Sequence, residues 1–163
     1  MPATPDDLFA RLAALGIATE TKWHAPVFTV DEAQAARGEM PGGHCKCLFL
    51  RDKKNALWLM VAEENIRVDL KALAKQLGAD RFSFASPALL MRHLGVEPGT
   101  VTPFALINDT QRAVRVALDK AMLAGGALHY HPLTNAATTR IVAADLLRFI
   151  AECGHEPEIV ELG

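Results

Sequence analysis

Residues 45–62 read CKCLFLRDKKNALWLMVA, and this stretch decides the fold class. Two mainly apolar runs, 45–51 and 57–62, flank a polar segment at 52–55. Short apolar runs separated by polar turn residues predict two strands that are adjacent in the chain. Because other predicted strands also come in adjacent pairs, we expect a mixed α/β (α+β) fold. The expected architecture is a largely antiparallel mixed sheet, or a partial barrel, surrounded by helices.

The rest of the chain supplies further strands and helices around this pair. Thr4, Asp69 and Ser86 are typical helix N-caps, and a glycine follows the apolar stripe of each helix. Val96 begins a predicted loop that runs to Phe104. We find no repeat and no linker, so one domain spanning 1–163 is expected. The predicted helices are 5–15, 31–37, 69–77, 86–94 and 145–153, and the further extended segments are 21–30, 81–85, 113–118, 127–130, 139–142 and 158–162.

Composition excludes several classes of protein. Apolar residues make up 50% of the 163 residues and the formal net charge is 17 − 19 = −2, which argues against intrinsic disorder. The longest apolar run, 56–62, is too short for a membrane span, and the N-terminus does not resemble a signal peptide. Near-neutral charge also argues against a globally basic DNA-binding protein, although a local basic patch stays possible. The odd number of cysteines, three, favours a reducing cytoplasm.

Most motifs of cofactor-dependent or nucleophilic catalysis are absent from the sequence. It has no phosphate-binding glycine loop, no dinucleotide fingerprint and no nucleophile elbow. Only one set of potential metal ligands is visible, and the alternative for its cysteines is that they are small buried residues of a sheet. We favour that alternative and expect no metal and no cofactor. The potential ligands are His44, Cys45, Cys47, His129 and His131.

Lys46 is conspicuous because it interrupts an apolar run. An ammonium group in such a place must face either water or a partner, since burying it unpaired is costly. Lys46 is therefore either the solvent-facing residue of an edge strand or a point charge that holds an anionic ligand in a pocket.

Two loops could supply further polar groups to such a pocket. In the first, Gly99 allows close approach of the backbone and Pro103 fixes the far end, so free amides could bind a developing oxyanion. In the second, His131 and Asn135 precede the hydroxyls of Thr138 and Thr139. Both loops could equally be ordinary connections whose polar groups satisfy their own backbone.

These three segments together resemble the YbaK/ProX family, which comprises the prolyl-tRNA synthetase-associated editing domains and their free-standing relatives. The resemblance rests on Lys46 preceding Leu-Phe-Leu-Arg, on the G-x-x-x-P loop at 99–103 followed by Phe104, and on His-Pro-Leu-Thr-Asn at 131–135. It extends over nearly the whole chain. The lysine segment is most similar to the free-standing branch that removes alanine from tRNA(Pro). That branch often carries Asn after the lysine, where this chain has Cys47, and the cysteine-removing branch is the nearest alternative.

The resemblance implies a metal-independent aminoacyl-tRNA hydrolase that uses no enzyme nucleophile, in which a ribose hydroxyl of the substrate helps to activate water. Lys46 would position the terminal nucleotide or the ester. The backbone around Gly99, Thr100 and Val101 would bind the oxyanion. The implied substrate-binding residues are Pro103, Phe104, His131 and Asn135.

The implied partners are aminoacylated tRNA(Pro) and, transiently, prolyl-tRNA synthetase, with no membrane and no DNA. Phosphate contacts would come from exposed basic side chains. Two other classes stay open at this point: a nucleic-acid-binding module without chemistry, and a metal-dependent enzyme that uses the His/Cys set. The candidate phosphate-binding residues are Arg37, Arg51, Lys53, Lys54, Lys71, Lys75 and Arg81.

Overall fold

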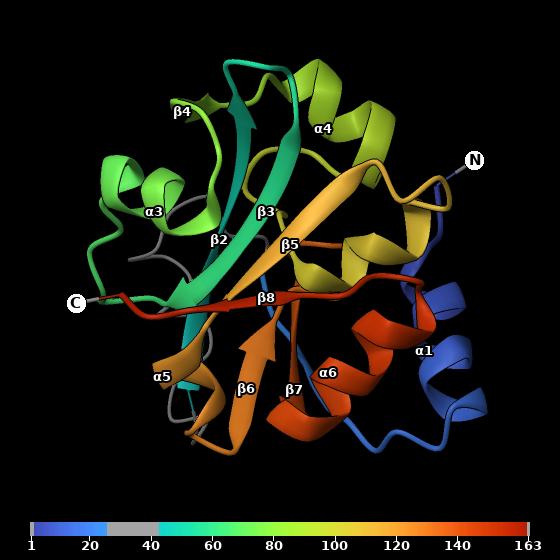
Figure 1. Ribbon diagram of the computed structural model, residues 1–163. Helices are drawn as coiled ribbons and strands as arrows, with labels where there is room; N and C mark the ends of the chain where they lie inside the picture. The colour runs from blue at the N-terminus through green and yellow to red at the C-terminus, as the bar shows by residue number, and fades with distance from the viewer. Residues whose placement is uncertain (1, 26–42, 163) are drawn as a thin grey trace.

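The computed structural model describes residues 2–25 and 43–162, which form an eight-stranded mixed sheet with helices packed outside it (Figure 1). The strands are β1 (Glu20–Trp23), β2 (Gly43–Asp52), β3 (Leu57–Glu63), β4 (Phe82–Phe84), β5 (Val114–Asp119), β6 (Ala127–Tyr130), β7 (Ala137–Val142) and β8 (Glu158–Val160). The helices are α1 (Pro5–Ala14), α3 (Leu70–Leu77), α4 (Pro87–Leu94), α5 (Lys120–Leu123), α6 (Ala143–Glu152) and the 3₁₀ helix η1 (Pro103–Asn108).

The strand order is β1-β7-β6-β2-β3-β5-β8, and β4 pairs with β2 beside this path. The pairs β1–β7, β6–β7, β2–β3 and β2–β4 are antiparallel. The pairs β2–β6, β3–β5 and β5–β8 are parallel. The structure confirms the predicted mixed sheet with helices outside it, and antiparallel pairs outnumber parallel ones only narrowly. The parallel pairs join segments far apart in the chain, which local sequence patterns do not reveal.

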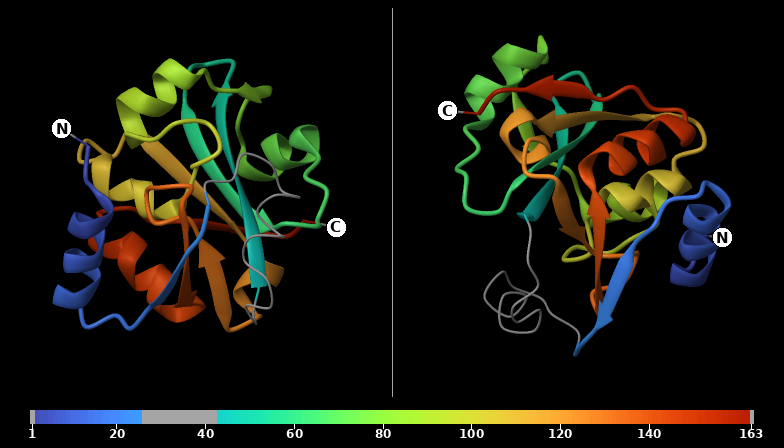
Figure 2. Two further views of the ribbon diagram at one scale, coloured as in Figure 1. Left: turned by 180° about the vertical axis from the view of Figure 1, so that it is seen from behind. Right: turned by 90° about the horizontal axis from the view of Figure 1, so that it is seen from below.

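Each face of the sheet carries its own hydrophobic cluster, because successive side chains of a strand point to opposite faces. Leu57, Leu59 and Val61 of β3 belong to the larger cluster, which includes residues of α1, α4, η1 and α6. Trp58 and Met60 belong to the smaller cluster, which includes residues of α3, β4 and β8. Figure 2 shows α1 and α3 at opposite sides of the molecule, consistent with this division.

The predicted helix caps form as expected. Thr4 Oγ1 accepts a hydrogen bond from the Asp7 amide, and an Asp7 carboxylate oxygen accepts one from the Thr4 amide, at 3.1 and 2.9 Å. The side chains of Asp69 and Ser86 cap α3 and α4 by accepting hydrogen bonds from amides of the first turn, and Gly78 and Gly95 end these helices in the left-handed conformation. Each N-cap contributes about 1 kcal/mol, so the helix boundaries follow from local chemistry.

Two short helices were not predicted. The loop expected at 96–104 ends earlier, because η1 begins at Pro103, where the Thr102 hydroxyl accepts a hydrogen bond from the Phe104 amide at 3.2 Å. α5 spans only four residues, too few for an apolar stripe to appear. The helix predicted at 31–37 lies outside the described residues. Among the described helices, none is both long enough and apolar enough to cross a membrane.

Candidate functional site

Lys46 lies within β2, and His131 directly follows β6, the parallel neighbour of β2. The register of β2 and β6 places His44 opposite His129, and their rings stack with centroids 4.3 Å apart. Lys46 and His131 each follow this stacked pair by two residues, and residues two apart in an extended chain share a face. The register therefore places the chain near Lys46 next to the chain near His131, although 85 positions separate the two residues.

The Lys46 ammonium group is half-buried and has a defined partner. It donates a hydrogen bond to the backbone carbonyl of Ile66, in the segment that follows β3. No carboxylate among the described residues lies within ion-pair distance of it, so its charge is not neutralised by them. At Lys46 the strand β2 pairs with β3, while its pairing with β6 ends at His44 and its pairing with β4 begins at Leu50. Both alternatives for Lys46 therefore stay open, and a role in holding an anionic group stays a prediction.

The glycine loop presents two amides that are not engaged within the described part of the chain. The Thr100 amide donates to the Glu97 carbonyl at 3.0 Å and is therefore committed to a turn. The amides of Gly99 and Val101 have no hydrogen-bond acceptor among the described residues. Gly99 has a φ of +90°, which L side chains rarely adopt, and a Cβ there would meet nothing within 4 Å. Backbone conformation, and not lack of space, requires the glycine.

Pro103 and Phe104 are buried beneath this loop. The Phe104 ring is fully buried, and it packs edge-on against Tyr130 and Phe149 with centroids 6.0 and 5.5 Å apart. The sequence placed both residues among the substrate-binding side chains. Their burial anchors the loop to the core, and their predicted role in substrate binding stays a prediction.

Tyr130 connects the three candidate segments. Its ring contacts Phe104, which ends the glycine loop, and its hydroxyl lies against the Cys45 thiol, next to Lys46. The same hydroxyl donates to Met122 Sδ at 3.3 Å, and His131 follows Tyr130 directly in the chain. Tyr130 was not among the residues predicted from the sequence. It is the only tyrosine of the protein, and a buried phenol that must find a polar partner was the available signal.

His131 is held in one orientation by the backbone. Its Nδ1 donates to the Ala137 carbonyl at 2.8 Å, so Nε2 is the nitrogen with a lone pair when the ring is neutral. Burial lowers the pKa of His131, and a charge on His24 lowers it further, while the bond to Ala137 opposes these effects. Asn135 is half-buried in the same loop, where the Thr134 hydroxyl accepts from the Ala136 amide at 3.2 Å. The loop satisfies part of its own backbone and also presents His131.

The cysteines of β2 pack into the larger cluster. Burial raises the pKa of Cys45 to about 11 and raises that of Cys47 well above its usual value. Cys153 is also a free thiol, and burial raises its pKa to about 11. Within residues 2–25 and 43–162, no three His, Cys, Asp or Glu side chains lie close enough to hold a metal ion. This arrangement supports the interpretation of Cys45 and Cys47 as buried sheet residues.

The basic side chains proposed for phosphate contacts lie around the β2–β3 turn, α3 and the start of β4. All six that the structure describes are exposed: Arg51, Lys53, Lys54, Lys71, Lys75 and Arg81. Arg37 lies outside the described residues. Their contact with tRNA stays a prediction.

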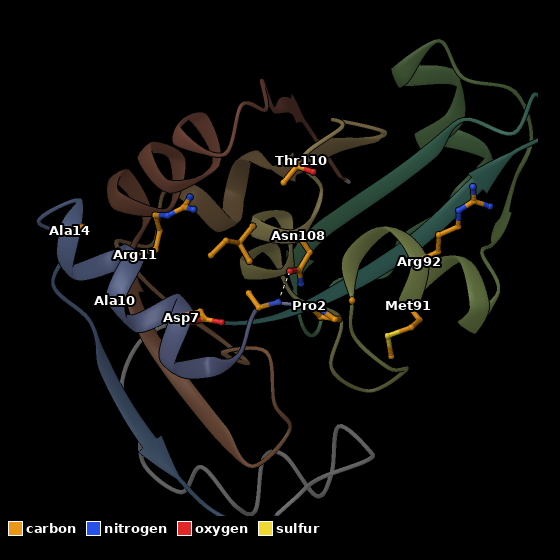
Figure 3. Close-up of a pocket in the computed structure, with 12 residues that line it drawn as sticks. Pro2, Asp7, Ala10, Arg11, Ala14, Met91, Arg92, Asn108 and Thr110 are labelled. Atoms are coloured by element: carbon orange, nitrogen blue, oxygen red, sulfur yellow. Dashed lines mark hydrogen bonds between the residues drawn. The ribbon is translucent and has the colours of Figure 1, made fainter.

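A separate groove of about 900 Å³ lies between α1 and the C-terminal end of α4 (Figure 3). Asn108 forms part of its wall, accepting from the Ala3 amide and donating to the Leu94 carbonyl, both at 2.8 Å. Arg11 and Arg92 also line the groove. It contains none of the predicted site residues and is distinct from the site around Tyr130.

Comparison with known proteins identifies the fold and its relatives. The model of a family described as "Aminoacyl-tRNA editing domain" matches residues 24–149. The bovine (Bos taurus) "Prolyl-tRNA synthetase associated domain-containing protein 1" is 41% identical over 155 residues, which covers 92% of this chain and 90% of the relative. The "Prolyl-tRNA editing protein ProX" of Acetoanaerobium sticklandii is 33% identical over 156 residues, which covers 95% of both proteins.

A solved structure gives the same result for the fold. A protein described as a candidate trans-editing enzyme for prolyl tRNA synthetase superposes with a TM-score of 0.74 and 20% sequence identity. The superposition covers 99% of this chain and 98% of the other. At this level of identity the likeness establishes the mixed α/β architecture.

Proposed function

The chain belongs to the aminoacyl-tRNA editing domain family, and we propose that it is a trans-editing deacylase that hydrolyses mischarged tRNA(Pro), with Ala-tRNA(Pro) as its main substrate. Membership of the family confirms the resemblance found at Lys46 and at the two loops. The observation that carries the proposal is that Tyr130 contacts Phe104 and Cys45, and these contacts hold the backbone of the lysine strand, the end of the glycine loop and the start of the His131 loop next to one another. The reducing cytoplasm is the proposed compartment, and prolyl-tRNA synthetase is a transient partner.

The proposed reaction is hydrolysis of the ester between the amino acid and the terminal ribose. The oxygen of water forms a bond to the carbonyl carbon, the ester C–O bond to the ribose breaks, and the ribose oxygen takes a proton. The products are a free amino acid and tRNA. Lys46 holds the anionic end of the tRNA as a point charge, and the amides of Gly99 and Val101 stabilise the oxyanion. A neighbouring ribose hydroxyl helps to activate the water.

Selectivity for alanine is proposed to come from exclusion of the larger proline. A synthetase pocket built for proline discriminates against a smaller side chain by only about 1–3 kcal/mol for each missing methylene group. A second site that is too small for proline corrects the resulting errors. The His131 loop would form one wall of that site, and His131 itself is neutral because its pKa is lowered.

The direct test is a deacylation assay with purified protein and a panel of Ala-, Cys- and Pro-tRNA(Pro), with and without a chelator. We expect hydrolysis of Ala-tRNA(Pro) to be fastest, Pro-tRNA(Pro) to be spared and the chelator to have no effect. Faster hydrolysis of Cys-tRNA(Pro) would reassign the substrate to cysteine. Tight binding of tRNA without hydrolysis would instead identify a non-catalytic binding module, and loss of turnover with chelator would identify a metal enzyme.

A further inference from the structure

His24, at the end of β1, makes hydrogen bonds to β7 on both sides of one residue. Its backbone amide donates to the Ala136 carbonyl at 2.9 Å, and its ring Nε2 lies 2.9 Å from the hydroxyl of Thr138. The residue between them is Ala137, whose carbonyl accepts the Nδ1–H of His131. His24 thus fastens the short segment that in turn fixes the ring of His131.

The hydrogen bonds of His24 define its tautomer. Ring Nδ1 lies 2.9 Å from the Ala25 carbonyl, which can only accept, so Nδ1 carries the proton. In the neutral ring Nε2 is then an acceptor, and the Thr138 hydroxyl donates to it. Both nitrogens of His24 are therefore occupied by the protein. A histidine with no free nitrogen is suited to holding structure and not to proton transfer with a substrate.

The two histidines also interact electrostatically. Their ring centroids are 6.5 Å apart, and a charge on His24 disfavours a charge on His131. Glu20 lies opposite Arg140 in the register of β1 and β7. The strand register places both of these residues on the face of the sheet that carries His24, together with two further titratable groups, Lys22 and His129.

We propose that His24 is a positioning residue for His131. By holding β7 at Ala136 and Thr138, it keeps the Ala137 carbonyl where it orients the His131 ring and leaves Nε2 as the acceptor. The expected loss of deacylation rate rests on the proposed function. The effect of His24 on the orientation of the His131 ring does not depend on it. His24 was not among the predicted site residues, because a lone histidine at the end of a short polar strand carries no motif.

The structural arm of the test uses nuclear magnetic resonance of the histidine rings in free protein. In the wild type we expect His131 to show one fixed tautomer with Nδ1 protonated. In H24A the two ring nitrogens of His131 should shift toward averaged values, and its pKa should rise because the opposing charge is gone. T138V keeps both histidines but removes the hydroxyl, so it should perturb the tautomer without removing the charge. The half-exposed His93 of α4 supplies the matched control, and H93Q should leave the His131 signals unchanged.

The kinetic arm measures kcat/KM for deacylation by H24A, H131A and the double variant. We expect H24A to lose about tenfold, as small misplacements of active-site groups commonly do, and to lose nothing further when combined with H131A. Unchanged His131 ring signals in both H24A and T138V, or losses that multiply in the double variant, would overturn the proposal. If the wild type deacylates no tRNA, the proposed function fails, while the ring signals still decide the role of His24. Should H24A not fold, T138V alone decides it.

Discussion

An interior strand and an edge strand of the sheet differ in how they are covered. β3 is buried along six of its seven residues, because one hydrophobic cluster packs on each of its faces. β1, at one edge of the sheet, is largely exposed, and polar residues occupy one face of the neighbouring β7 and β6. The doubly covered interior buries apolar side chains on both faces and so stabilises the fold. The polar edge provides the groups that hold and orient His131.

The largest expected effect is on stability in the doubly covered interior of the sheet. Leu59→Ala, at a side chain with 0% exposure, should lower the free energy of unfolding by about 3 kcal/mol, since it leaves a cavity in a packed core. Val142→Ala, at a 40% exposed residue of β7, should change it by less than about 0.5 kcal/mol. Chemical denaturation measures both. Similar losses for the two variants would contradict the division of the sheet.

A smaller effect is expected from pH, with opposite signs at two places. His131 has a lowered pKa in the folded state, so stability is present above its unfolded value near 6.5 and is lost as the pH falls below it. Cys45 has a pKa raised from 9.0 to about 11, so stability is present below pH 9 and is lost as the pH rises toward 11. Urea midpoints across pH 5 to 11 measure both effects. H131N should reduce the pH dependence on the acid side only. Cys45→Ala should reduce it on the alkaline side only, where Cys47 and Cys153, whose pKa values are also raised by burial, keep part of it. An effect of H131N on the alkaline side, or of Cys45→Ala on the acid side, would contradict these assignments.

The features that could be predicted from the sequence are those that local patterns determine. The β2–β3 pair, the turn between them and three capped helices were predictable, because local apolar runs and cap residues determine them. The parallel pairing of β2 with β6 was not, since it joins Gly43 and His44 to Leu128 and His129 across most of the chain. Lys46 and His131 were found as polar exceptions and through the family resemblance. Tyr130 and His24 were missed, because their roles depend on contacts with segments that no local pattern connects to them.

The most direct test of the account compares Lys46→Ala with Lys54→Ala in single-turnover deacylation of Ala-tRNA(Pro). Both remove one ammonium group from the same pair of strands, but Lys46 is half-buried and donates to the Ile66 carbonyl, whereas Lys54 is exposed in the turn. We expect Lys46→Ala to slow hydrolysis by about 10²-fold with unchanged thermal unfolding, because it removes charge stabilisation at the reacting ester. Lys54→Ala should slow it less than about twofold. Equal rates for Lys46→Ala and the wild type would contradict the assignment of this site.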